Sequence, residues 1–187
     1  MTSHGGAAHE VYSVSIDDLF AVSTPDVPKV DLGMYDAELA AVTTTYLSGG
    51  QFGEGLVIND EFGNKANRFR WEFLLLDETG EPVYETDEDG NVIPGDPITV
   101  DCVTGLQFYP LAKNPSKQSR IMLALLTPDE AAVWKDGGKC VPLTALLGRK
   151  VQVQVDENSK GWPTAANVLP PRARRAKARS TAAESDA

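Results

Sequence analysis

One nine-residue stretch, residues 68–76, constrains the fold more than any other part of the chain, because polar and large apolar side chains alternate along it. Its sequence is RFRWEFLLL, so an extended backbone places Phe69, Trp71 and Phe73 on one face and the two arginines and the glutamate on the other. A period of two is typical of a β-strand with one buried face. Three aromatic side chains on one face match the interior of a β-barrel, so this strand predicts a sheet that curves around a core.

Four other segments show strand character. They are residues 35–47, 98–103, 150–155 and 164–169. The clearest is 150–155, where valine alternates with lysine or glutamine. Residues 81–97 indicate a hairpin inserted between the second and third strands, with its tip at 87–91, DEDGN.

Helical signals fall between the third and fourth strands. Residues 116–126 are rich in helix formers, and Ser116 is a suitable N-cap. A second helix starts after Thr127, with a proline at its first position and Glu130 completing a capping box. A short helical turn at 143–148, closed by a glycine, precedes the fourth strand.

The order of these elements is three strands, a helical insert and two strands. Five strands with a helix between the third and the fourth resemble an OB-fold, a partly open Greek-key barrel. A small β-sandwich would account for the number of strands but not for the helix. We therefore expect an all-β protein, a five-stranded OB-fold-like barrel with a helical insert between strands 3 and 4, flanked by flexible termini.

Charge and composition divide the 187 residues into one domain and two terminal segments. We expect a flexible N-terminal arm at 1–32, the OB-fold-like domain at 33–170 and a disordered basic C-terminal tail at 171–187. Residues 170–187 contain five basic and two acidic side chains and no large apolar one, so burial cannot offset the entropy cost of ordering them. The rest of the chain has 12 basic and 25 acidic side chains, a net charge of −13.

The sequence favours a cytoplasmic protein that does not span a membrane. No apolar run approaches the ~20 residues of a membrane-spanning helix, and the N-terminus lacks the basic-then-apolar order of a signal peptide. Two cysteines in 187 residues do not form a disulfide framework, which is the usual pattern of a reducing compartment.

Few residues have the spacing that catalysis or metal binding requires. Both histidines, His4 and His9, lie near the N-terminus, so the core lacks the base of a Ser/His/Asp or Cys/His arrangement. Cys102 and Cys140 have neither a CxxC partner nor a histidine nearby, which argues against zinc and favours packing roles. No phosphate-binding glycine motif occurs, and no spacing selects a carboxylate pair. We expect no enzymatic activity, no cofactor and no bound metal.

Residues 77–101 contain nine acidic side chains and neither lysine nor arginine. The tip at 87–91 lacks the spaced ligands and the distal glutamate of a calcium loop, so a solvated hairpin tip is the preferred interpretation. Its negative charge would repel phosphate along that edge.

Basic side chains elsewhere point to nucleic acid. In OB-folds, single strands cross the second and third strands and contact the loops between strands 1 and 2 and between strands 4 and 5. The candidate nucleic-acid-binding residues are Arg68, Arg70, Lys113, Lys117, Arg120, Arg149, Trp162, Arg172, Arg174 and Arg175. Trp162 is the preferred exposed aromatic for base stacking; the weaker candidates are Phe52, Phe62, Phe108 and Tyr109. An ordinary solvated face for Arg68 and Arg70, and a packing role for Trp162, remain alternatives.

Several short motifs carry a family resemblance. They are FRWEF at 69–73, NPSKQSR at 114–120 with LALL at 123–126, LTALLGRKVQV at 143–153 and NVLP at 167–170. Together they resemble small OB-fold-like proteins encoded by bacteriophages in replication or recombination gene neighbourhoods, which are often regarded as single-stranded DNA-binding proteins. The resemblance covers residues 33–170 and implies single-stranded DNA as the partner, alongside phage or host replication proteins in the host cytoplasm. The acidic hairpin at 81–97 and the basic tail depart from it.

The expected function is therefore non-sequence-specific binding of single-stranded DNA in phage replication or recombination, with the tail from Arg172 to Arg179 as a tethered electrostatic clamp. The alternative is a phage structural or adaptor module that binds another protein and has no nucleic-acid role. Its acidic domain would then meet a basic partner.

Overall fold

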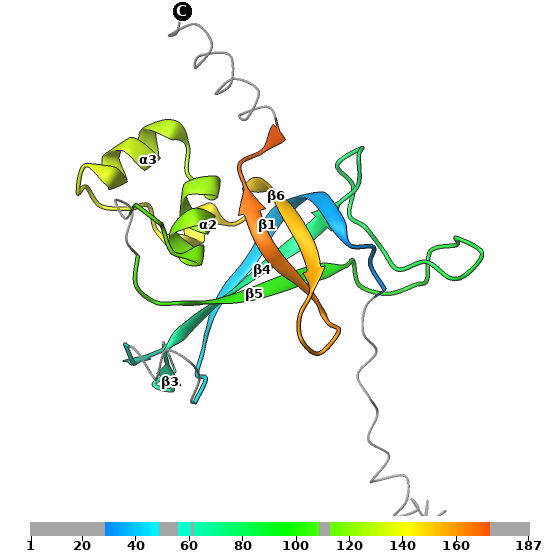
Figure 1. The fold of residues 1–187 in the computed structure, drawn as a ribbon, viewed down its shortest axis with the longest axis horizontal. Helices are drawn as coiled ribbons and strands as arrows, with labels where there is room; N and C mark the ends of the chain where they lie inside the picture. Colours follow the sequence, from blue (N-terminus) through cyan, green and yellow to red (C-terminus); the bar gives the residue numbers. More distant parts are fainter. Residues whose placement is uncertain (1–28, 49–55, 61, 109–112, 173–187) are drawn as a thin grey trace, which may run out of the picture.

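The computed structural model describes residues 29–48, 56–60, 62–108 and 113–172, whose strands close into a five-stranded barrel (Figure 1). The barrel strands are β1 (Gly33–Thr45), β4 (Arg68–Leu76), β5 (Thr99–Gly105), β6 (Lys150–Glu157) and β7 (Pro163–Leu169). Their order is β1-β4-β5-β7-β6, and β6 pairs with β1 to complete the circle. The β5–β7 pairing is parallel and the others are antiparallel. A mostly β, closed five-stranded barrel is thus confirmed.

The pattern of β4 in the sequence predicts its position and its burial. The strand begins and ends at the predicted residues, and Trp71, Phe73 and Leu75 are fully buried in the barrel core. Arg70 points outward and is exposed. Phe69 is partly buried and packs against the core, which fits the predicted barrel interior.

The length of β1 allows the barrel to close. Its first half pairs with β6, from Gly33 opposite Val155, while most of the strand pairs with β4. A register shift between Leu39 and Ala41 bends the strand, as β-bulges do. β1 therefore pairs with β4 on one side and with β6 on the other, and these two pairings close the barrel.

The helical insert lies between β5 and β6 as predicted. It consists of α2 (Lys117–Leu125), α3 (Pro128–Lys135) and the 3₁₀ turn η1 (Leu143–Leu146). The Ser116 hydroxyl caps α2 by accepting from the Ser119 N–H at 3.3 Å. Thr127 and Glu130 form the predicted capping box of α3. Ile121 and other apolar residues of α2 join the hydrophobic core.

A bidentate ion pair attaches α3 to the segment that leads into β6. Arg149 donates to both carboxylate oxygens of Glu130, at 2.5 and 2.9 Å, and to the backbone carbonyls of Leu125 and Ala145. The Arg149 guanidinium and the Thr127 backbone N–H hold the pKa of Glu130 at about 2. The pair therefore has a structural role that sequence patterning did not reveal.

Replacing Glu130 with glutamine should lower the free energy of unfolding by about 1–2 kcal/mol at neutral pH, because one charge-assisted pair is lost. The pKa of Glu130 is lower in the folded protein than in the unfolded chain, so its contribution is complete above about pH 4.5 and disappears as the pH falls towards 2. Thermal melts of both proteins across this range should therefore converge at low pH. A difference that stays constant with pH would contradict this role.

The segment between β1 and β4 contains structure that the sequence did not predict. A short hairpin forms there from β2 (Ile58–Asn59) and β3 (Lys65–Ala66). Buried Asn67 ties the base of this segment together, exchanging hydrogen bonds of 2.9 Å with the backbone N–H and carbonyl of Leu47. The two-residue strands are too short to show a period in the sequence.

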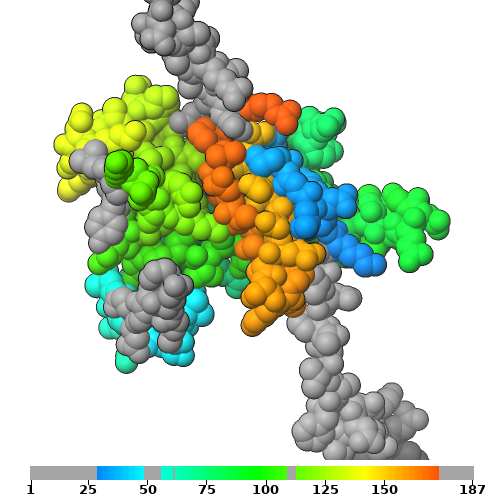
Figure 2. Space-filling model, in the orientation of Figure 1, coloured from blue at the N-terminus to red at the C-terminus, as the bar shows by residue number. Residues whose placement is uncertain are grey.

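The predicted hairpin at 81–97, termed the acidic hairpin, projects from the barrel (Figures 1 and 2). Its arms meet at the Thr86–Val92 bridge, and the Asp87 carboxylate accepts from the Asn91 N–H at 2.8 Å to close the tip. Gly90 has a φ of +83°, which a glycine adopts without strain. Residues 87–91 are exposed, as expected of a hairpin tip.

The terminal predictions fall mainly on residues 1–28 and 173–187, which lie outside the described residues. The last four residues of the predicted N-terminal arm are described: Val30 packs against the core, and the Lys29 N–H donates to Glu85 at 3.2 Å. In the described part of the chain, no helix is both long and apolar enough to cross a membrane.

Candidate nucleic-acid interface

The outer face of β4 and β5 carries the candidate residues that the sequence placed on the second strand. Arg68 lies opposite Gly105, and Arg70 lies opposite Val103 on β5 and Thr43 on β1. Arg68 is partly exposed and donates to the Asn67 carbonyl at 2.8 Å. The two arginines therefore share one surface, as their two-residue spacing predicted.

Charge changes sign along this face. Arg68 lies at the end next to the β2–β3 hairpin, which itself contains Lys65, whereas Glu72 and Asp101 face each other farther along β4 and β5. Arg70 lies between them and forms an ion pair with Asp101, although its side chain is 55% exposed. An exposed pair of this kind contributes only about 0–1 kcal/mol. A phosphate could therefore replace Asp101 as the partner of Arg70 at small cost.

The β2–β3 hairpin presents an exposed aromatic ring beside this basic end. The Asp60 carboxylate accepts from the backbone N–H groups of Phe62 at 2.9 Å and Asn64 at 2.7 Å, which fixes the turn. Gly63 has a φ of +79°, a conformation that favours glycine. Phe62 is consequently held outward with 80% of its surface exposed.

A hollow of about 410 Å³ separates this hairpin from β1. Phe62 and Ile58 line one side, and Val42, Thr43 and Thr44 line the other. Because Thr43 lies directly opposite Arg70 in the β1–β4 register, the hollow adjoins the basic end of the β4 face. The hollow thus holds an exposed ring and the Asp60 carboxylate, and its nearest link to a cation is the Thr43–Arg70 pairing.

Trp162, the preferred stacking residue, is half-buried rather than exposed. It closes the β6–β7 turn, where the Asn158 carboxamide oxygen accepts from its backbone N–H at 3.2 Å. Thr164, two residues on, donates its hydroxyl to the Asp101 carbonyl and fixes the end of the turn against β5. Trp162 is therefore less exposed than the preferred interpretation expected, and its part in base stacking stays a prediction.

Two of the predicted basic residues donate hydrogen bonds to other groups of the protein. Lys117 donates to the Ala165 carbonyl at 2.5 Å, and Arg149 is held by Glu130. Lys113 and Arg120 are exposed, before and within α2 respectively. Their part in nucleic-acid binding stays a prediction, as does that of Lys117 and Arg149.

The remaining candidates lie apart from the β4 face or outside the described residues. Arg172 lines a hollow with the start of β1 and the end of β4. Phe108 packs between Phe69 and Trp134, with ring centroids 5.7 and 6.1 Å apart, and so has a core role. Outside the described residues lie Phe52, Tyr109, Arg174 and Arg175.

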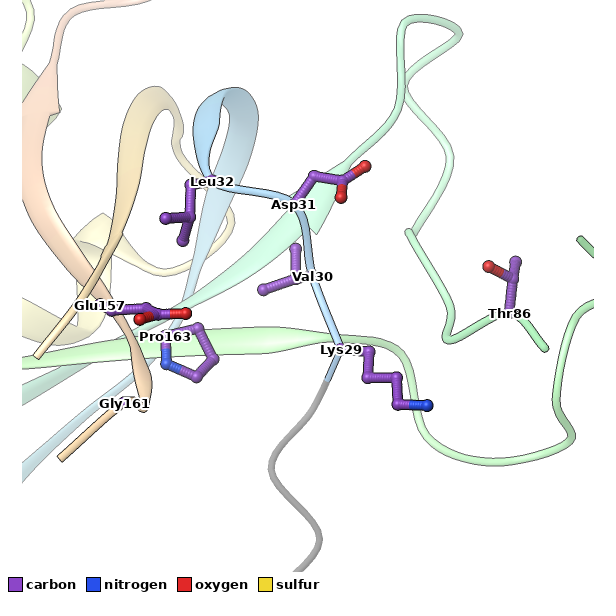
Figure 3. A pocket seen from close by; sticks show the side chains of 8 residues that line it. All are labelled: Lys29, Val30, Asp31, Leu32, Thr86, Glu157, Gly161 and Pro163. Carbon is purple, nitrogen blue, oxygen red and sulfur yellow. The ribbon is translucent and has the colours of Figure 1, made fainter. Parts of the chain in front are cut away.

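A second hollow, of about 540 Å³, lies beside the β6–β7 turn (Figure 3). The segment from Lys29 to Leu32 runs between that turn and Thr86 of the acidic hairpin (Figure 3). Asp31 and Glu157 line it together with Lys29, so its negative charge does not favour a phosphate.

Burial keeps both cysteine thiols in their protonated form. Burial raises the pKa of the Cys102 thiol to about 11, so the thiol is protonated at neutral pH. Burial also raises the pKa of Cys140. Within the described ranges, no three side chains of histidine, cysteine, aspartate or glutamate gather in a way that could hold a metal ion.

Comparison with known proteins does not assign the chain to a family. No protein-family model matches the chain, and a search of curated proteins finds no significant match. The resemblance of residues 33–170 to phage-encoded OB-fold-like proteins therefore stays a prediction.

Proposed function

We propose that this protein is an OB-fold-like single-stranded DNA-binding protein without strong sequence preference. Its five strands close into a barrel, and the helical insert follows the third barrel strand, β5, as in the OB-fold arrangement. In that fold, the outer face of the second and third strands and the adjoining loops bind oligonucleotides. The corresponding face here is that of β4 and β5.

The observation that carries the proposal is Phe62, an exposed aromatic ring that shares a hollow with Thr43, the residue directly opposite Arg70. Proteins that bind single strands without sequence preference combine stacked aromatic rings with cations that contact the backbone phosphates. Single-stranded DNA bound at Phe62 would also contact Arg68 and Arg70 on the neighbouring outer face of β4. Duplex DNA keeps its bases stacked inside and could not use the ring in this way.

The acidic side chains restrict where the strand can lie. Glu72 and Asp101 lie in the middle of the face, and the turn after β4 continues with Asp77 and Glu78. These carboxylates repel the phosphates of DNA. The single-stranded DNA therefore crosses the β4–β5 sheet near Arg68 and does not follow β4 along its whole length. The barrel therefore contacts only a few nucleotides, and the basic tail supplies further contacts to the phosphates.

A second candidate, an adaptor that binds another protein, is favoured by the apolar surface of the segment between β1 and β4. Exposed large apolar side chains there are Leu47, Leu56, Val57, Ile58 and Phe62. Clusters of this kind are typical of protein-interaction sites. A role in phage replication or recombination rests on the family resemblance alone.

Fluorescence anisotropy with the full chain and a labelled single strand of about 30 nucleotides distinguishes these functions. We expect binding that is tighter than to the matching duplex and that weakens with salt. In the double variant Arg68→Ala/Arg70→Ala, the salt slope should become shallower by about 1.4, because each lost phosphate contact on a single strand contributes about 0.7.

The matched control is Lys135→Ala/Lys139→Ala, which removes the same charge from exposed positions at and beyond the end of α3. If the two double variants change the affinity and its salt slope equally, the affinity depends on the net charge of the protein and not on the β4 face. Absence of single-strand binding would refute the proposal and favour the adaptor.

A further inference from the structure

A hollow of about 720 Å³ lies where β1 begins and β4 ends. Arg68 begins β4, and Leu76 ends it opposite Asp36 of β1. The hollow therefore lies at the other end of β4 from the proposed DNA site. We call it the acidic groove; its relevant lining residues are Leu32, Met34, Asp36, Asp77, Glu78 and Arg172.

The lining combines carboxylates with exposed aliphatic side chains. Leu32 is 54% exposed and Met34 is 44% exposed. Asp77 is committed to its own turn, because its carboxylate accepts from Thr79 and Glu81. The Asp36 carboxylate accepts a single hydrogen bond from Gln152, at 3.1 Å, and Glu78 has no partner among the described residues. Two carboxylates in the groove thus retain capacity for a cation.

The strand register brings the C-terminal segment to this groove. Leu169 of β7 lies opposite Gln152, Gln152 lies opposite Asp36, and Asp36 lies opposite Leu76. The chain therefore leaves the barrel in the same row as Asp36, and Arg172 lines the groove three residues later.

The sequence that follows Arg172 is complementary in charge. It places Arg174, Arg175, Lys177 and Arg179 immediately after the groove, whereas residues 1–169 carry a net charge of −13. Seven residues span up to about 23–25 Å when extended, so all four cations stay within that distance of Arg172, which itself lines the groove. Because the segment is tethered, its effective concentration at the groove is in the millimolar range, and weak ion pairs are enough to hold it.

We propose that the acidic groove is the docking site of the chain's own basic segment, residues 172–179. Docking places these cations on carboxylates at the far end of β4 from Phe62. If the proposed function holds, single-stranded DNA must compete with the groove for the segment, and the phosphate contacts of the tail form only after its release. The domain then limits its own non-specific affinity for nucleic acid.

Limited trypsin digestion of the full chain tests the docking without DNA, because trypsin cuts after arginine and lysine throughout this segment. In the variant Asp36→Asn/Glu78→Gln, cleavage between Arg174 and Arg179 should be several-fold faster than in the wild type. Asparagine can still accept from Gln152, so the barrel should keep its thermal stability. The control, Asp129→Asn/Asp136→Asn, removes the same charge from exposed positions on and after α3 and should be cut at the wild-type rate.

Equal cleavage rates in all three proteins would overturn the docking. Protection that is lost when the protein is diluted would also overturn it, because the groove would then hold the tail of a second copy. DNA binding is measured separately: the groove variant should bind the single strand several-fold more tightly at low salt. Faster cleavage with no DNA binding by any variant would support the docking and refute the proposed function.

Discussion

Replacing Phe62 with alanine should weaken single-stranded DNA binding by roughly 5- to 150-fold, the equivalent of about 1–3 kcal/mol for one stacked base. The ring is 80% exposed, so its removal leaves no cavity in the core. The affinity should therefore fall while the melting temperature stays the same. Anisotropy titrations and thermal melts on the same samples measure both quantities.

Two further variants sharpen this prediction. Phe62→Tyr keeps an aromatic face and should bind almost like the wild type. Val133→Ala, at a position that is 55% exposed on α3, is the control for losing an exposed apolar side chain elsewhere. If Phe62→Ala and Val133→Ala bind equally well, Phe62 does not contact the strand.

Replacing Trp71 with alanine should lower the free energy of unfolding by about 3–5 kcal/mol, the range for large aromatic side chains in a core. Trp71 is fully buried, and its indole N–H donates to the Thr104 hydroxyl at 2.8 Å across the β4–β5 pair. The variant loses both the packing and this hydrogen bond. Urea denaturation followed by far-UV circular dichroism gives the difference.

Trp71→Phe separates the two contributions. It keeps most of the ring, and the Thr104 hydroxyl can still donate to the Gly105 carbonyl, so a smaller loss is expected. A loss below about 1 kcal/mol for Trp71→Ala would mean that the barrel core does not depend on this ring.

Periodic segments of the fold could be predicted because their burial follows from local sequence. In β4 each buried ring alternates with a polar residue, and in α3 the capping box fixes the first turn through contacts within four residues. The position of the bulge in β1 could not be predicted in this way. It depends on how β1 pairs with β4, and that information lies in another part of the chain.

The candidate site was less accessible to sequence reasoning, because exposure depends on tertiary contacts. Phe62 and Trp162 both follow polar turn residues, yet the ring of Phe62 is 80% exposed and Trp162 is half-buried. The Asp60–Asn64 spacing, with a glycine before the asparagine, was the available signal for an exposed tip. No local pattern could have shown that Arg149 is paired with Glu130, since the partners come from different elements.

The double pairing of β1 has a consequence for how the chain reaches its native state. Gly33 at the start of β1 finds its partner Val155 only after more than a hundred intervening residues have been added. Contacts between such distant residues form late and slow the folding of β-barrels. During synthesis, one edge of β1 consequently stays open until β6 has left the ribosome. That open edge is where a nascent chain of this protein is most exposed to strand pairing with its neighbours.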